Sequence, residues 1–139
     1  MIMQNPNIEI KKWFINRLRT DTSLVVYDGG NIPPDTGNEY VTITGRQAGQ
    51  EQGKTGYTSE CTIICNIVAK SSNFGYDRTE VISNLILAGI NSDTAIGLPT
   101  GWSATRLYVE SVTNLDSLNP LDNVFQTIIT YSLIITQTQ

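Results

Sequence analysis

The sequence predicts an α+β fold in which an antiparallel sheet of about four to five strands carries two helices packed on one face. Apolar residues recur at helical spacing in two segments and alternate with polar residues in several others. Clusters of glycine, proline, asparagine and aspartate separate these segments. The resulting order of helix, short strand, two long strands, helix and two long strands is typical of the α+β class.

The first helix is expected within residues 5–21, NPNIEIKKWFINRLRTD. Asn5 can cap its start, and Pro6 suits the first helical position because proline lacks the N–H that a helix start leaves unpaired. We interpret the basic residues of this segment as a solvated helix face rather than a contact for DNA or an acidic partner. The apolar residues at helical spacing form the opposite face: Ile10, Trp13, Phe14 and Leu18.

Two strands are expected after this helix. A short strand spans about residues 24–27 in SLVVYDG, and the breaker-rich stretch GGNIPPDTGNE ends it. The next segment, EYVTITGR at residues 39–46, places Val41 and Ile43 on one face and hydroxyl-bearing residues on the other. This period of two predicts a half-buried strand.

The stretch AGQEQGKT, residues 48–55, has the letters of a phosphate-binding loop. That motif needs a helix after Gly-Lys-Thr, because the N-terminal N–H groups of the helix hold the phosphates. Instead, residues 56–70, GYTSECTIICNIVAK, alternate with a period of two and predict a strand. We therefore interpret residues 45–56 as a long, flexible, projecting hairpin loop, and keep as an alternative a P-loop-like nucleotide-binding protein that uses Lys54 and Thr55.

A second helix is expected over about residues 77–90, followed by two long strands in GWSATRLYVESVTN and NVFQTIITYSLIITQ. The stretch LDSLNPLD joins the two strands as a turn. The helix residues expected against the sheet are Val81, Ile82, Leu85, Ile86 and Gly89. The last strand places one row of apolar residues on a single face: Phe125, Ile129, Tyr131, Leu133 and Ile135.

Length and composition favour a single soluble domain over residues 1–139. The apolar share is 40% and the charged share is 16%, a balance that suits a sheet-rich globular protein. The net charge is −4 and the basic residues are scattered, which argues against sequence-specific binding of nucleic acid. No apolar run approaches the length of a membrane span, and the first residues lack the pattern of a signal peptide.

The residue types that carry most enzyme chemistry are missing or scattered. The chain has no histidine, which removes the usual general base and the commonest transition-metal ligand. Its two cysteines, Cys61 and Cys65, lie about 13 Å apart along a strand, beyond the roughly 7 Å that a disulfide allows between α-carbons. We interpret both as buried small hydrophobic residues, and we expect no catalytic residue, metal or cofactor.

Several features occur in one order along nearly the whole chain: a first amphipathic helix, the transition VVYDG…IPP…EYVTI, a long loop, a long strand, and FGYDRTEVISNLILAGI followed by two strands. This order resembles that of the tail terminator or tail completion family of tailed bacteriophages. In that family, small α+β subunits close into a ring where the head joins the tail. The resemblance implies a structural virion protein rather than an enzyme, made in the cytoplasm of the bacterial host.

The resemblance also implies partners. We expect a homo-oligomeric neck or tail ring of six or twelve subunits that contacts connector, neck or tail proteins, with non-specific passage of DNA through its lumen. A second alternative is an adaptor module of a phage-like contractile particle. The residues expected to contact an adjacent ring or subunit from the projecting loop are Arg46, Gln50, Glu51 and Lys54.

Overall fold

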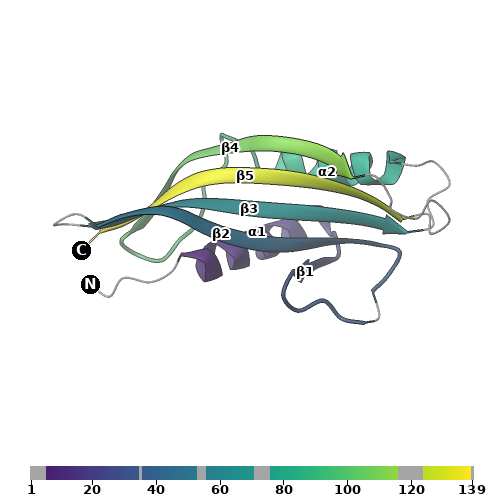
Figure 1. Ribbon diagram of the computed structural model, residues 1–139, viewed down its shortest axis with the longest axis horizontal. Coiled ribbons are helices and arrows are strands. Elements are labelled where there is room, and N and C mark those ends of the chain that lie inside the picture. Colours follow the sequence, from purple (N-terminus) through teal and green to yellow (C-terminus); the bar gives the residue numbers. More distant parts are fainter. Residues whose placement is uncertain (1–5, 35, 53–55, 71–75, 116–123, 139) are drawn as a thin grey trace.

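A computed structural model describes residues 6–34, 36–52, 56–70, 76–115 and 124–138, with the backbone alone for residues 47–52 and 56–57. Five strands form one sheet in the order β1-β2-β3-β5-β4. The elements, in chain order, are α1 (Asn7–Thr22), β1 (Val26–Asp28), β2 (Glu39–Gln52), β3 (Gly56–Lys70), α2 (Asp77–Gly89), β4 (Trp102–Leu115) and β5 (Val124–Thr138) (Figure 1).

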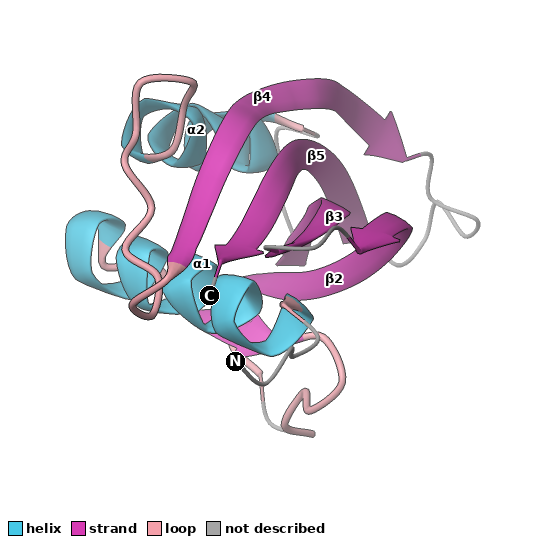
Figure 2. Ribbon diagram, turned by 90° about the vertical axis from the view of Figure 1, so that its left-hand side faces the viewer, coloured by secondary structure: helices cyan, strands magenta, loops and turns pink. Residues whose placement is uncertain are grey.

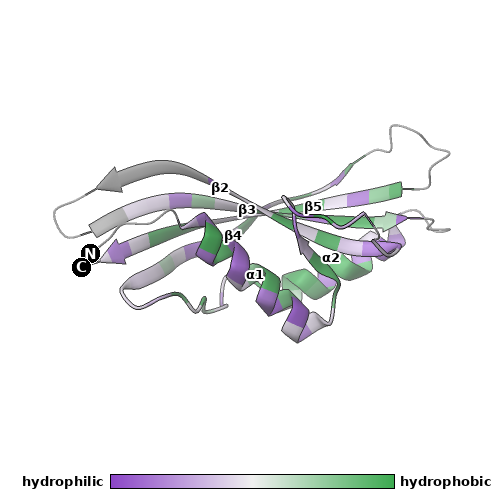
Figure 3. Ribbon diagram, turned by 90° about the horizontal axis from the view of Figure 1, so that it is seen from below, coloured by the Kyte–Doolittle hydropathy of each residue, from purple (hydrophilic) through white to green (hydrophobic). Residues whose placement is uncertain are grey.

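The α+β class and its two helices on one face are confirmed, and one detail of the sheet differs. Both helices lie on the same side of the sheet (Figures 2 and 3), which we call the helix face, and we call the other side the open face. β2, β3, β5 and β4 pair antiparallel, but β1 runs parallel to β2, so the sheet is mixed. The parallel pairing arises because the chain crosses from β1 to β2 through the long segment 29–38 instead of a tight hairpin.

Helix α1 is held by the apolar face that its sequence predicts. Ile10, Phe14 and Leu18 recur every four residues and are fully buried, while Trp13 is partly buried beside them. The helix follows Pro6, which occupies the cap position, and it ends where Ser23 adopts the left-handed conformation at φ 56°. The expected capping residue Asn5 lies outside the described residues.

Helix α2 buries a narrower stripe than expected. Ile82 and Ile86 face the sheet, together with the small polar residues Thr79 and Ser83. Val81 and Leu85, which the spacing also assigned to the sheet, are 47% and 44% exposed, so that part of the prediction was wrong. The reason is geometric: only one stripe of a helix reaches a flat neighbour, and Val81 and Leu85 lie beside it.

The core lies between the helices and the two central strands. On the helix face, alternate residues of β3 and β5 are almost fully buried: Cys61, Ile63, Cys65 and Ile67 on β3, and Ile129, Tyr131, Leu133 and Ile135 on β5. Phe125, expected in the same row, is only partly buried. This alternation matches the predicted strand period and places the two rows against α1 and α2.

The predicted hairpin between two antiparallel strands is confirmed, but its loop is shorter than the expected residues 45–56. β2 continues through Gln52, which lies opposite Tyr57 of β3, so only residues 53–55 lie between the two strands. A register shift between Ala48 and Gln50 accommodates the extra residue Gly49. The polar side chains gave no strand signal, yet backbone N–H and C=O groups pair regardless of side chains once a partner strand runs alongside. The hairpin reaches one end of the long axis of the molecule (Figure 1).

The two faces of β3 give a matched test of this core. We expect Ile63→Ala, on the helix face, to lower the free energy of unfolding by about 2–5 kcal/mol, because Ile63 is fully buried and its removal leaves a cavity. Ile64→Ala, on the open face, should cost markedly less, because Ile64 already keeps part of its surface in water. Urea unfolding followed by circular dichroism measures both, and equal losses would contradict the assignment of the faces.

Candidate assembly surfaces

Metal binding and attack by a thiol nucleophile depend on a few kinds of side chain. No group of three or more histidine, cysteine, aspartate or glutamate residues is gathered among them. Cys61 and Cys65 are both free and buried, as the sequence predicts for small hydrophobic residues, and burial raises the pKa of their thiols to about 11 and about 12. Within the same residues, neither helix has the length and apolar character needed to cross a bilayer.

The segment that follows Gly-Lys-Thr bears on the alternative that residues 48–55 form a phosphate-binding loop. β3 begins at Gly56, so a strand follows Gly-Lys-Thr, as predicted, where a phosphate loop requires a helix N-terminus. Lys54 and Thr55 themselves lie outside the described residues. Asp28, the last residue of β1, serves a turn: its carboxylate accepts the N–H of Gly30 at 2.9 Å and pairs with Lys11 at 2.9 Å. These two contacts hold the pKa of Asp28 below its usual value.

The open face of the sheet is polar with isolated apolar residues. Hydroxyl residues face one another across the central strands, as with Thr62 opposite Ser132. Charges of both signs are present: Glu110 accepts a hydrogen bond from Ser132 at 2.8 Å, and Arg106 lies with Glu60 around a shallow depression of about 280 Å³. No helix covers this face among the described elements. Such a surface can contact other molecules without presenting a strong field of one sign.

The two edges of the sheet are unequal. β4 forms one edge over fourteen residues. Register shifts between Thr105 and Tyr108 and between Val109 and Ser111 interrupt its pairing with β5. The other edge is the three-residue strand β1, where the guanidinium of Arg19 donates two hydrogen bonds to the carbonyl of Val26 at 2.5 and 3.1 Å. Bulges and a side-chain cap are two ways in which proteins limit unwanted pairing at sheet edges.

The predicted contact residues do not share a loop tip. Arg46 is exposed on β2 opposite Thr62, which places it on the open face. Gln50 and Glu51 belong to β2 as well, opposite Ser59 and Thr58, and Lys54 lies outside the described residues. A role of these residues in subunit contact stays a prediction.

Sequence reasoning missed the exposed apolar residues of β4. Tyr108 and Val112 are 51% and 48% exposed, and Val109 and Leu115 are also exposed. The sequence carries no signal of the irregularity, because the run RLYVE alternates as a regular strand does, whereas in the structure Arg106 adopts φ 55° at the first bulge. That β4 lies at an edge follows only from the order of the strands.

The fold and its surfaces define a small α+β protein with one covered sheet face, one open face and one long free edge. No known protein family and no curated protein matches the chain in sequence. Among solved structures, a chain described as part of the virion of a native gene transfer agent particle is similar, with a TM-score of 0.75 and 14% identity. The match covers 92% of this chain and 95% of that one, so the two chains share a fold over nearly their full lengths.

The cysteines test the packing beneath these surfaces. We expect neither Cys61 nor Cys65 of the folded protein to react with a thiol-disulfide reagent at pH 8, because both are buried and their raised pKa values keep them protonated at that pH. In denaturant the same assay should count two thiols. Rapid labelling of the folded protein would contradict the position of β3 at the centre of the sheet.

Proposed function

We propose that this chain is a structural protein of a phage-like virion, a non-enzymatic subunit that forms a ring in the neck or tail, as tail terminator or tail completion proteins do. One observation carries the proposal: the likeness in fold to a chain of a gene transfer agent virion over nearly the full length of both chains. The element order that resembles tail terminators supports it independently.

The surfaces suit such a role. A ring subunit needs faces that meet its neighbours and a surface toward the channel, and it needs no catalytic group. The long β4 edge supplies a surface for contact with a neighbouring copy, and the uncovered open face supplies one toward the channel or toward adjoining proteins. No histidine occurs in the sequence, and the described cysteines are buried, so the chemistry available at these surfaces is recognition by shape and charge.

The charge of the chain is compatible with a channel through which DNA passes. DNA is retained by clustered lysine and arginine residues that neutralise its phosphates. The net charge of −4 and the mixture of signs on the open face do not provide such a cluster.

We propose a ring of six or twelve subunits between connector, neck or tail proteins, located in the virion after synthesis in the bacterial host. An adaptor of a phage-like contractile particle would need the same contact surfaces and the same ring. The neighbouring genes would distinguish such an adaptor from a phage neck or tail protein.

The ring can be measured directly. We expect the purified protein to elute from a sizing column with light scattering as an oligomer of six or twelve copies, and negative-stain images to show closed rings. The number of copies is what the resemblance to tail terminators implies, and surfaces that one copy leaves uncovered support association between copies. A protein that stays monomeric and also fails to bind tail or connector components would rule the proposal out.

The alternative of a nucleotide-binding protein predicts that the chain binds ATP or GTP, whereas our proposal predicts that it does not. We expect a titration with Mg²⁺ and ATP or GTP up to about millimolar concentration to give no signal, because a strand replaces the helix N-terminus that would hold the phosphates. Calorimetry or fluorescence of Trp13 and Trp102 can follow it. Magnesium-dependent binding that Lys54→Ala abolishes would support the alternative instead.

A further inference from the structure

One side of the molecule is a basic flank, formed by α1 and the segment around β1. Lys11, Lys12 and Arg19 line a groove of about 520 Å³ between them, and Asp28 is the one acidic residue among its described lining. Lys11 pairs with Asp28 at 2.9 Å, and Arg19 donates to a neutral carbonyl. Among the described lining of the groove, three positive charges thus face one negative charge, which pairs with Lys11 rather than with Lys12 or Arg19.

Apolar residues stand among the charged and polar residues of the same groove. Ile15, Tyr27 and Pro33 contribute to its lining. Ile8, also in the lining, is 68% exposed, and the neighbouring Ile32 is 46% exposed. A groove that combines apolar residues with an excess of positive charge matches an occupant that presents small apolar side chains next to carboxylates.

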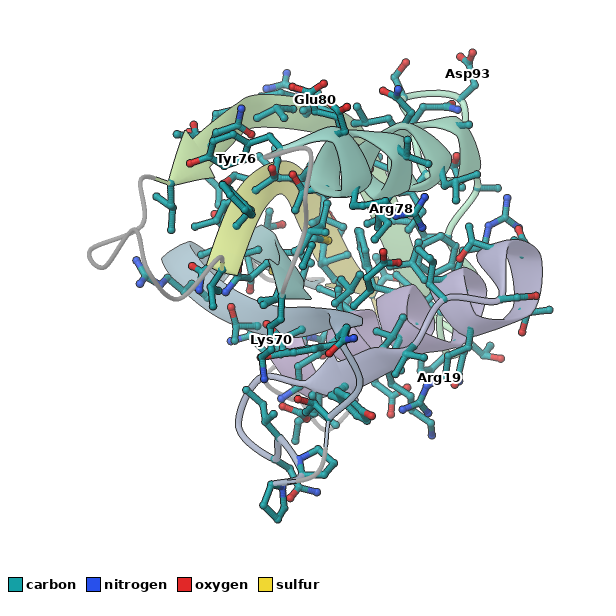
Figure 4. All side chains as sticks on the ribbon, turned by 90° about the vertical axis from the view of Figure 1, so that its right-hand side faces the viewer. Arg19, Lys70, Tyr76, Arg78, Glu80 and Asp93 are labelled. Atoms are coloured by element: carbon teal, nitrogen blue, oxygen red, sulfur yellow. The ribbon has the colours of Figure 1, made fainter. Side chains whose placement is uncertain are left out.

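The opposite side of the molecule is an acidic flank, formed by α2 and β4. The first turn of α2 carries Asp77 and Glu80, its last turn carries no basic residue, and Asp93 follows the helix. Arg78 is turned away toward β2, where it forms an ion pair with Glu39 at 2.6 Å. Figure 4 shows Glu80 and Asp93 on one side of the molecule and Arg19 on the other.

The acidic flank also carries a valine ledge, Val109 and Val112 of β4. Their register opposite Tyr131 and Ile129 places them on the helix face, yet they are 36% and 48% exposed. The cause is that α2 packs on β3 and β5, so β4 extends beyond it. The hydroxyl of Tyr76 bonds to the carbonyl of Leu115 and holds the start of α2 beside the end of β4. The ledge thus lies next to the acidic first turn of the helix.

We propose that the basic flank of one copy receives the acidic flank of the next, with the valine ledge seated in the α1–β1 groove and Lys12 and Arg19 facing Asp77 and Glu80. The occupant is a second copy of this chain, and the inference rests on the proposed ring function. The two flanks lie at opposite edges of the sheet, since β1 and β4 end the strand order. A contact between two different patches of one chain repeats head to tail, and such a contact generates a ring when its rotation closes.

A charge swap tests the contact. Lys12→Glu places a negative charge opposite the acidic flank of the next copy, and Glu80→Lys places a positive charge opposite its basic flank, so each variant alone should self-associate at least about tenfold more weakly than the wild type. Mixed in equal amounts, the two variants should assemble again, because in an alternating ring the two reversed charges face each other at one contact and the two original charges at the next. Sedimentation velocity over a concentration series measures all three samples. Raising the salt concentration should weaken the wild-type contact by screening it.

Two controls keep this outcome separate from that of the proposed function. Glu60→Lys reverses the same charge on the open face and should leave assembly unchanged. Thermal melts establish that the variants fold. If the wild type forms rings and both single variants do so equally well, or if mixing restores nothing, the flank contact is wrong and the ring stands. A wild type that remains monomeric up to about millimolar concentration and binds no tail component overturns both.

Discussion

The structure depends on the register between β3 and β5. These strands pair without a shift from Gly56 opposite Thr138 to Lys70 opposite Val124. Because side chains alternate, this register decides which row faces the helices, and a slip of one strand by one residue would turn its buried row to the open face. Tyr131 shows what the register positions: its ring lies 5.4 Å from that of Phe14 of α1, and its hydroxyl donates to the carbonyl of Ile90 after α2 at 2.7 Å. One side chain of β5 thus joins both helices to the sheet.

The placement of α2 follows from the same strands. Near its start, the hydroxyl of Thr79 lies 2.9 Å from that of Thr127 on β5, and Thr127 also lies 2.7 Å from the side chain of Asn114 on β4. Just beyond its end, the contact of Ile90 with Tyr131 fixes it again. Both fixed points lie over β5, and the helix leaves Val109 and Val112 of β4 exposed, whereas Leu107 earlier in the strand is buried in the core. The valine ledge is a direct consequence of how the core is anchored.

The sequence was sufficient to predict a helix or strand where one face of that element is buried. The alternation of β3 and β5 and the spacing of Ile10, Phe14 and Leu18 record burial in the residues themselves, and these elements were predicted. The continuation of β2 through Gln52 could not be predicted from the sequence, because polar residues there form a strand through backbone hydrogen bonds that leave no apolar pattern. The parallel direction of β1, the edge position of β4 and the two flanks depend on which elements become neighbours. Spacing along one chain does not contain that information.

Arg19 explains why the proposed contact between copies is made by side chains and not by a continuous sheet. Its guanidinium donates hydrogen bonds to the carbonyl of Val26, on the side of β1 that faces away from β2. This contact blocks another strand from pairing with β1 there. The charge of Arg19 is not consumed by that contact, because the acceptor is neutral. The bulges of β4 interrupt the ladder on the opposite edge. With both edges unsuited to long backbone pairing, recognition between copies falls to the charges and apolar residues of the flanks, where a ring gains specificity for head-to-tail contact over indiscriminate sheet extension.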